Sequence, residues 1–485
     1  MRLRLSLLTL ILASLACQTL FPTPAPIPTA TARPPRPTAT LAPDVPTPTP
    51  PASLVPTESA DPNAVRACAY QPGVSIPAQM PAEVTNGATP TPYPTPAPPT
   101  PQAEDVATTA RQLKTYQDLW DTVNKNYLYA DFNGHDWNAV GKKYKALIQA
   151  GLSDDDFYLA MDEMIAELGD EHSFYESPAA VKESDASYAG NNDYVGIGVL
   201  HTLIGDRSVI IYTFPGSPAR EAGLKSHDAI LAVNGEPITS IDGGPSTAIR
   251  GPEGTSVTLT VTHPGGEPFD LTLIRRRITG AAPIDYCLVP GPRRIGYLFL
   301  PGLDDETFPD QMRAALEAFT RDGPLDGLVL DNRQNGGGAS DILENVLSLF
   351  MRGTVGQFVN RQEKRPLTIT PEDVGGSQSV PLIVLVDVDT ASFGEVMSGV
   401  LQNSGRARVV GQTTLGNVEI LWGYDFDDSS RVWLAHETFQ PVDLPNGIWE
   451  KTGIVPDVLV PTRWDLFSEA TDPALAKAVE LLSQP

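Results

Sequence analysis

The run Leu325-Asp-Gly-Leu-Val-Leu-Asp-Asn-Arg-Gln-Asn-Gly-Gly-Gly338 indicates the fold most directly. Its first half is a short apolar stretch without polar alternation, which is typical of a strand buried on both faces of a parallel sheet. Three glycines then precede a helical pattern over residues 340–351. In α/β folds, functional sites form at such strand-to-helix turns, because glycines and helix starts leave backbone N–H groups accessible.

Strand-like and helical segments alternate on both sides of this run. Further strands are predicted at 295–300, 382–386 and 407–410, and further helices at 307–320 and 395–402. Near-continuous apolar strands separated by helices predict a largely parallel sheet covered on both faces. We therefore expect an α/β/α core over residues 282–485.

Two segments with other periodicities precede this core. Residues 104–180 carry apolar side chains at three- and four-residue spacings and predict a helical domain. Residues 191–278 contain short strands, the first at 195–200, with one small helix, and predict a β domain. The fold class is therefore α/β, or α+β over several domains.

The N-terminal fifth of the chain has a different composition. About half of the 47 prolines lie between residues 21 and 101, where they alternate with Thr and Ala. Such a stretch has too few apolar side chains to form a core, so residues 18–103 are predicted to be a disordered stalk. Folded structure is expected from about residue 104.

An apolar run over residues 5–15 follows Arg2 and Arg4 and is too short to span a bilayer. It indicates a secretory signal peptide over residues 1–17. The sequence Leu12-Ala-Ser-Leu-Ala-Cys17 resembles a bacterial lipoprotein signal, so Cys17 is expected to carry lipid and to anchor the protein to a membrane. The expected location is extracytoplasmic, on a bacterial cell surface. An ordinary secretion signal is the alternative.

Charge and cysteine content limit the kinds of partner and of covalent or metal link that the chain is expected to have. Lys and Arg number 34 and Asp and Glu 59, which gives a net charge of −25 and argues against a nucleic-acid partner. Outside the cytoplasm, Cys68 and Cys287 can form a disulfide, and two free thiols are the alternative. The spacing of His, Cys and Asp does not suggest a metal site, and we expect no cofactor.

The run Gly216-Ser-Pro-Ala-Arg-Glu-Ala-Gly-Leu-Lys-Ser-His-Asp-Ala-Ile-Leu-Ala-Val-Asn-Gly235 resembles the bacterial PDZ signature. PDZ domains bind extended C-terminal peptides by adding them as a strand to a sheet edge. Because glycines beside a sheet edge leave amides for a carboxylate, the expected peptide-binding residues are Val195, Gly196, Ile197 and Gly198. A purely structural β domain is the alternative.

Several motifs together resemble the C-terminal processing peptidases and the tricorn core peptidases, one family of serine endopeptidases. In the family's order they are Leu168-Gly-Asp-Glu-His-Ser173, the PDZ insertion, residues 331–338, Thr390-Ala-Ser392, Gly405-Arg-Ala-Arg-Val-Val-Gly411 and Gly453-Ile-Val-Pro-Asp457. The resemblance implies a ClpP/crotonase-like core, polypeptide substrates and Ser392 as the nucleophile. The expected oxyanion donors are the Phe393 amide and that of Gly336 or Gly337.

One position departs from the processing peptidases. Their dyad lysine corresponds to Asn417, which cannot take a proton from a hydroxyl. The tricorn branch uses a Ser/His/Glu arrangement instead, and its residues match His172 and Glu450. We therefore predict His172 as general base, with Glu450 orienting the machinery or binding substrate, and His436 as the alternative base.

The sequence thus predicts an extracytoplasmic serine endopeptidase that cleaves unfolded proteins or C-terminal segments captured by its PDZ domain. The missing lysine motivates one alternative, an inactive pseudoprotease that acts as a PDZ peptide-binding module. A stalked adhesin or scaffold is another.

Overall fold

The computed structural model describes residues 65–76, 106–170, 172–239, 247–442 and 449–484. The predicted signal peptide, Cys17 and most of the predicted stalk lie outside the described residues. None of the helices within these ranges combines the length and the apolar character needed to cross a membrane.

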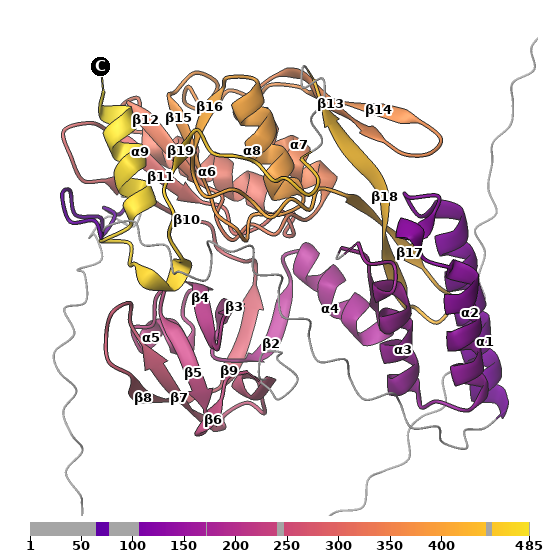
Figure 1. The fold of residues 1–485 in the computed structure, drawn as a ribbon. Helices are drawn as coiled ribbons and strands as arrows, with labels where there is room; N and C mark the ends of the chain where they lie inside the picture. The colour runs from indigo at the N-terminus through magenta and orange to yellow at the C-terminus, as the bar shows by residue number, and fades with distance from the viewer. Residues whose placement is uncertain (1–64, 77–105, 171, 240–246, 443–448, 485) are drawn as a thin grey trace, which may run out of the picture. The chain divides into compact units, whose positions relative to one another are not determined.

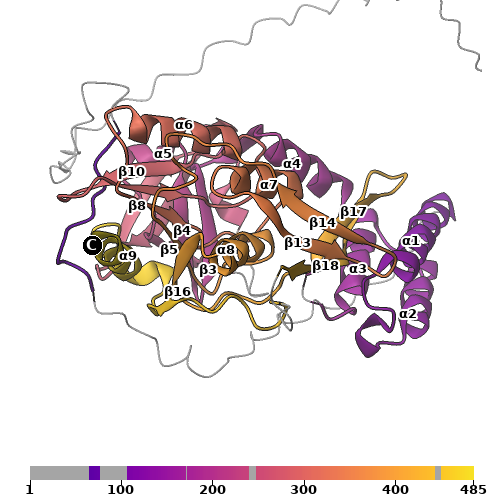
Figure 2. The ribbon, with the colours of Figure 1, turned by 90° about the horizontal axis from the view of Figure 1, so that it is seen from above.

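Three of the first four described α-helices form one cluster with a distant β-hairpin. The helices are α1 (Val106–Asn126), α2 (Trp137–Gln149), α3 (Asp154–Ala166) and α4 (Pro178–Tyr188). The hairpin pairs β17 (Ile420–Asp425) with β18 (Arg431–Pro441). Apolar side chains of α1, α2 and α3 share a core with Val432 and Leu434 of β18, and Figure 2 shows the hairpin beside these helices. The helical segment is therefore completed by strands far along the chain.

The PDZ-like segment forms a sheet in the order β3-β4-β5-β7-β8, with β6 beside β5 and with β2 paired separately to β9. The strands are β2 (Asn192–Gly196), β3 (Val199–Ile204), β4 (Arg207–Thr213), β5 (Ala229–Val233), β6 (Glu236–Pro237), β7 (Ser256–Thr262), β8 (Phe269–Ile274) and β9 (Arg276–Gly280). The short helix α5 is Pro218–Glu221.

The strand predicted at 195–200 is wrong, because the chain leaves β2 at Gly196 and begins β3 at Val199. Between them, Gly198 has a φ of +77°, and a Cβ there would lie 2.3 Å from the Cβ of Ser217. The left-handed backbone and this close approach both require glycine and divide the run into two strands of different sheets.

The core sheet has the order β10-β11-β12-β15-β16-β19, with every pair from β11 onward parallel. Its strands are β10 (Asp285–Val289), β11 (Ile295–Phe299), β12 (Gly327–Asp331), β15 (Leu382–Val386), β16 (Ala407–Gly411) and β19 (Val458–Leu459). Its helices are α6 (Phe308–Thr320), α7 (Ser340–Ser348), α8 (Phe393–Asn403) and α9 (Pro473–Ser483), and Figure 1 shows them around the sheet. The prediction of a largely parallel sheet is confirmed.

Helices cover both faces of this sheet. A Cβ on Gly296 of β11 would meet Phe319 of α6, whereas one on Gly327 of β12 would meet Leu482 of α9. Gly296 lies opposite Leu328 and Gly327 opposite Ile295, so the two glycines point to opposite faces. The helices α6 and α9 therefore enclose the apolar strands between them.

A further sheet, which the sequence did not predict, joins this core to the helical segment. It has the order β1-β18-β13-β14, with β1 (Phe174–Glu176), β13 (Gly353–Val359) and β14 (Lys364–Ile369). The long strand β18 pairs with β1 and β17 through its first part and with β13 through its last.

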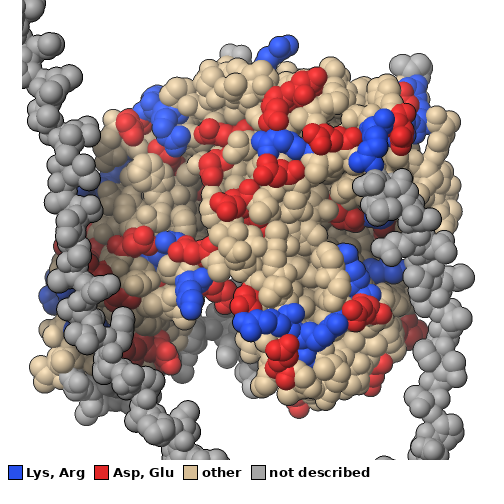
Figure 3. Space-filling view, turned by 180° about the vertical axis from the view of Figure 1, so that it is seen from behind, with Lys and Arg blue, Asp and Glu red and all other residues tan. Residues whose placement is uncertain are grey.

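On the face seen in Figure 3, acidic and basic side chains are interspersed. Exposed pairs of this kind contribute little stability.

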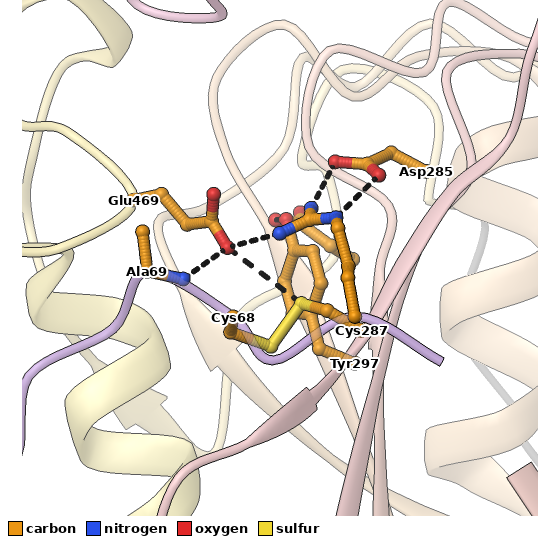
Figure 4. The surroundings of a disulfide bond; sticks show 8 residues. Cys68, Ala69, Asp285, Cys287, Tyr297 and Glu469 are labelled. Carbon is orange, nitrogen blue, oxygen red and sulfur yellow. Dashed lines mark hydrogen bonds and ion pairs between the residues drawn. A yellow bond between two sulfur atoms is a disulfide. The ribbon is translucent and has the colours of Figure 1, made fainter. Parts of the chain in front are cut away.

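A short N-terminal segment is fastened to the edge of the core sheet. Cys68 and Cys287 form a disulfide, and Ala67 makes a parallel bridge to Leu288 of the edge strand β10. Arg66 pairs with Asp285 and Glu469, and Figure 4 shows Glu469 beside the disulfide. Glu469 also accepts the Ala69 amide at 2.8 Å. Residues 65–76 thereby cover backbone groups that an open edge would expose.

Replacing Cys68 and Cys287 together with alanine should lower the free energy of unfolding by about 2–4 kcal/mol, because the disulfide restricts a long loop of the unfolded chain. Urea denaturation of the wild type and the double variant, each with and without reductant, measures the change. Reductant should destabilise only the wild type. Two free thiols in the non-reduced wild-type protein would contradict the bond.

Candidate active site

Ser392 stands at a strained turn between β15 and α8. Its backbone has φ 51° and ψ −127°, a region that non-glycine residues seldom adopt. The Ser392 amide donates to the Asn417 carbonyl at 2.8 Å, and the side chain makes no capping hydrogen bond to the helix. Ser392 therefore does not perform the N-capping that a serine at a helix start usually performs. A strained strand–turn–helix of this kind presents a hydroxyl as a nucleophile.

The glycine loop after β12 lies against this turn. A Cβ on Gly337 would stand 2.6 Å from the Cβ of Ser392 and 2.9 Å from the Phe393 nitrogen. The Gly337 amide donates to the Asn335 side chain at 2.9 Å. Within the described residues, the amides of Gly336 and Phe393 donate to no other group. Of the two glycines predicted as alternatives, Gly336 therefore has its N–H available for an oxyanion and Gly337 does not.

Buried polar groups hold the glycine loop against the Ser392 turn. The Gln334 side-chain amide donates to both Asp387 and Asp389, at 2.7 and 2.9 Å. Burial and the neighbouring Asp389 raise the pKa of Asp387 to about 6. From the other side, the Ala391 amide donates to the Asn335 carbonyl at 3.0 Å. These contacts determine how the loop faces Ser392.

A second loop, residues 414–419, is fixed to the start of α8 by Glu395. This buried carboxylate accepts the Thr414 hydroxyl and the amides of Gly416 and Asn417, the latter two at 2.7 and 2.8 Å. The Asn417 backbone is thus held by α8 on its N–H side and by Ser392 on its carbonyl side. The position predicted to match the dyad lysine of the processing peptidases, Asn417, therefore lies close to Ser392.

The next two residues of this loop reach the other predicted groups. The Val418 amide donates to Glu450 Oε2 at 2.8 Å. Glu419 Oε2 lies 3.9 Å from His172 Nδ1, and its Oε1 accepts the Tyr129 hydroxyl at 2.7 Å. The three residues from Asn417 to Glu419 therefore connect Ser392, Glu450 and His172.

His172 is partly buried, with 16% of its side chain exposed, and its buried Nδ1 has no hydrogen-bond partner among the described residues. Burial lowers the pKa of His172 to about 4, and the Coulombic effect of Asp170 opposes this shift in part. Asp170 also accepts the backbone amides of His172 and Ser173, which orders the turn. The described hydrogen bonds do not include one between Ser392 and His172.

His436, the alternative base, is engaged elsewhere. Its Nδ1 lies 3.0 Å from both the Asn126 carbonyl and the Tyr424 hydroxyl, and its Nε2 lies 3.4 Å from the Asn360 side chain. Its ring stacks on Trp422 at 4.3 Å. Both nitrogens and one ring face therefore serve the packing of the β17–β18 hairpin.

The four predicted peptide-binding residues divide between two environments. Val195 and Gly196 belong to β2 and pair with Arg277 and Arg276 of β9. Ile197 has a buried side chain, and its carbonyl accepts an amide from α5. Within the described residues, the amides of Ile197 and Gly198 donate to no other backbone group. They precede β3, which is an edge strand of its sheet.

Sequence reasoning missed Glu419 and Tyr129. Both approach the site only because the hairpin packs against the helical segment. In the sequence, Glu419 lies two residues after Asn417, the position matched to the lysine of the processing peptidases. This closeness was the one feature of the sequence that could have pointed to Glu419.

Comparisons with known proteins agree over most of the chain. Residues 294–460 match the model for peptidase family S41, residues 110–166 the tricorn protease C1 domain, and residues 214–262 a PDZ domain. The carboxyl-terminal-processing protease of Synechocystis sp. is 31% identical over 73% of this chain and 82% of its own length. The chloroplastic C-terminal processing peptidase of Tetradesmus obliquus is 28% identical over 73% and 78%.

Solved structures show the same likeness. The photosystem II D1 C-terminal processing protease aligns with a TM-score of 0.52 and 25% identity, over 77% of this chain and 97% of that protein. A putative S41 protease from Bacteroides fragilis aligns with a TM-score of 0.51 and 17% identity, over 76% and 97%, and supports the fold alone.

Proposed function

The chain belongs to peptidase family S41, with the carboxyl-terminal-processing serine proteases, and from this premise we propose that it is an active endopeptidase with Ser392 as nucleophile and His172 as base. The observation that carries the proposal is the Ser392 turn. Its hydroxyl makes no helix cap, and within the part of the chain that the structure describes the nearby amides of Phe393 and Gly336 donate to no other group. These are the parts that acyl transfer needs, a nucleophile next to donors for an oxyanion.

The proposed base differs from the lysine of the processing peptidases. Asn417 cannot accept a proton, whereas burial keeps His172 neutral at pH 7 and able to accept one. We propose that His172 Nε2 takes the Ser392 proton as Oγ attacks the peptide carbonyl. His172 then protonates the leaving amine, and water hydrolyses the acyl-enzyme. In structures without substrate, catalytic hydrogen bonds are often not yet formed. The lack of a described hydrogen bond between Ser392 and His172 is therefore compatible with this role.

The proposed role of Glu450 is to orient this machinery. It accepts the Val418 amide, between the residue that holds Ser392 and the residue that faces His172. Burial raises the pKa of Glu450. Through the Val418 amide, the Glu450 carboxyl would hold the flanking residues Asn417 and Glu419 in position.

The PDZ domain supports a polypeptide substrate. We propose that a C-terminal or extended segment adds to the β3 edge, with its carboxylate near the amides of Ile197 and Gly198. In the wider organisation that we propose, a helical domain over residues 104–180 and a PDZ domain over 191–278 precede a catalytic core over 282–485. Residues 1–17 would be a signal peptide and 18–103 a stalk, interrupted at residues 65–76, which are fastened to the edge of the core sheet.

We propose an extracytoplasmic location with a lipid anchor at Cys17. The Cys68–Cys287 disulfide supports it, because such bonds persist in oxidising compartments and are rare in the cytosol. The apolar run after Arg2 and Arg4 supports a signal peptide.

A fluorophosphonate probe tests the proposed activity. Wild-type protein should become labelled on Ser392, and Ser392→Ala should lose both labelling and peptide hydrolysis. Ser404→Ala, which alters the serine at the end of α8, is the matched control and should keep both. Absence of labelling in folded wild-type protein from pH 5 to 9 would contradict the proposal. That result would favour the pseudoprotease, which the Asn417 substitution motivates.

A further inference from the structure

We propose that Glu419 is a positioning residue for His172, holding the Nδ1 side of the imidazole so that Nε2 faces Ser392. This inference rests on the proposed role of His172 as base. It assigns the direct contact with the imidazole to Glu419 and places Glu450 one step behind it.

The geometry of two unpartnered atoms carries the inference. His172 Nδ1 and Glu419 Oε2 are both buried and lie 3.9 Å apart, and neither has a hydrogen-bond partner among the residues that the structure describes. Only 2% of the Glu419 side chain is exposed, so water cannot readily replace a protein partner. Buried polar groups are nearly always hydrogen-bonded, and a shift of about 1 Å would satisfy both atoms at once.

Tyr129 fixes the other end of the carboxyl. Its hydroxyl donates to Glu419 Oε1 at 2.7 Å, which leaves Oε2 as the oxygen that meets His172. The Tyr129 ring packs edge-on against the buried ring of Tyr127, at 5.7 Å between centroids. The direction of the carboxyl is therefore determined by a packed aromatic side chain and not by solvent.

The two glutamates act as a pair. Burial and the neighbouring Glu450 raise the pKa of Glu419 to about 8, because close carboxyls resist ionising together. A proton retained between them leaves negative charge near the imidazole. Asp170 is the other carboxylate acting on His172. When His172 takes the Ser392 proton, this charge stabilises the imidazolium, and Nδ1–H has Oε2 as its acceptor.

Glu419→Gln is the sharpest test, since it keeps the side-chain shape. Its amide can donate to Nδ1 and stabilise the tautomer with hydrogen on Nε2, which cannot accept the Ser392 proton. We expect kcat to fall roughly 10²–10⁴-fold with KM within about twofold, and Glu419→Asp to restore part of the loss. Above pH 8, where the Glu419 carboxyl is ionised, nitrogen NMR of His172 should show hydrogen on Nδ1 in the wild type and on Nε2 in Glu419→Gln.

Two variants separate this role from general destabilisation. Glu437→Gln removes another fully buried carboxylate, from the adjacent strand β18, and should keep kcat. Tyr129→Phe removes only the hydroxyl and should lower kcat about tenfold. It also provides the test if Glu419→Gln does not fold.

The outcomes distinguish this inference from the proposed function. Full activity in His172→Ala would overturn the base and the positioning role together. Inactive His172→Ala with wild-type kcat in Glu419→Gln, or in Tyr129→Phe where Glu419→Gln is unfolded, would overturn only the positioning role.

Discussion

Replacing His172 with alanine should reduce peptidase activity almost as far as replacing Ser392. Nucleophile and base act as a unit, so losing either one is expected to lower kcat by at least roughly 10⁴-fold. His436, the alternative base, is not expected to take over, because it is engaged in its hairpin. Steady-state hydrolysis of a fluorogenic peptide, with folding checked by thermal melting, measures the effect.

Two controls sharpen this experiment. His436→Ala should keep kcat within a few fold, even where the loss of stacking on Trp422 lowers stability. The double variant Ser392→Ala/His172→Ala should be no less active than either single variant. A His172→Ala enzyme with full activity, together with an inactive His436→Ala, would reverse the assignment of the base.

The pH profile tests the same residue. Because burial lowers the pKa of His172 to about 4, kcat/KM should decline on the acid side near pH 4 and not near 6.5. The folded state binds this proton less readily than the unfolded chain does. Stability from neutral His172 is therefore complete above about pH 6.5 and is lost as the pH falls towards 4. His172→Ala should flatten this part of the stability profile.

Arg333→Met should cause the largest loss of stability, about 3–5 kcal/mol. Arg333 is 1% exposed and pairs with Asp331 and Asp472, at 2.5 and 2.6 Å from one terminal nitrogen. Its guanidinium also lies 5.1 Å from the ring centres of both Trp464 and Phe467. The substitution leaves two buried carboxylates without their cation, which is far costlier than losing an exposed pair.

The chain contains a matched control for this experiment. Arg431 likewise pairs with two aspartates, Asp185 and Asp425, and lies over a ring, that of Trp433. Both aspartates have more than half of their side chains exposed, so Arg431→Met should cost no more than about 1 kcal/mol. Chemical denaturation compares the two variants, and equal losses would refute the role of burial.

Arg333 also belongs to the loop that faces Ser392. The Arg333→Met variant should therefore lose peptidase activity at denaturant concentrations below those that unfold it. The same two rings contact His227 of the PDZ-like segment, at 4.2 and 4.5 Å between centroids. The buried Arg333 therefore supports the glycine loop, and through Asp472 it supports the start of α9. Through the two rings it also supports their contact with His227, which lies just before β5.

The sequence by itself determined the parts whose chemistry is local. Short apolar strands ending in glycine loops predicted the parallel sheet and the place of Ser392, and a contiguous signature predicted the PDZ domain. A cap such as Ser153, which accepts the Asp156 amide, is local in the same way, because its partner lies three residues away. These features depend on neighbours in the chain.

Only the tertiary structure decided which groups meet across the site. Whether Gly336 or Gly337 keeps a free amide depends on where the Asn335 side chain points. The approach of Glu419 to His172 depends on a hairpin packing against helices from the other end of the folded region. Hydrogen bonds act over about 3 Å, and spacing along the chain does not determine distances between segments that packing brings together.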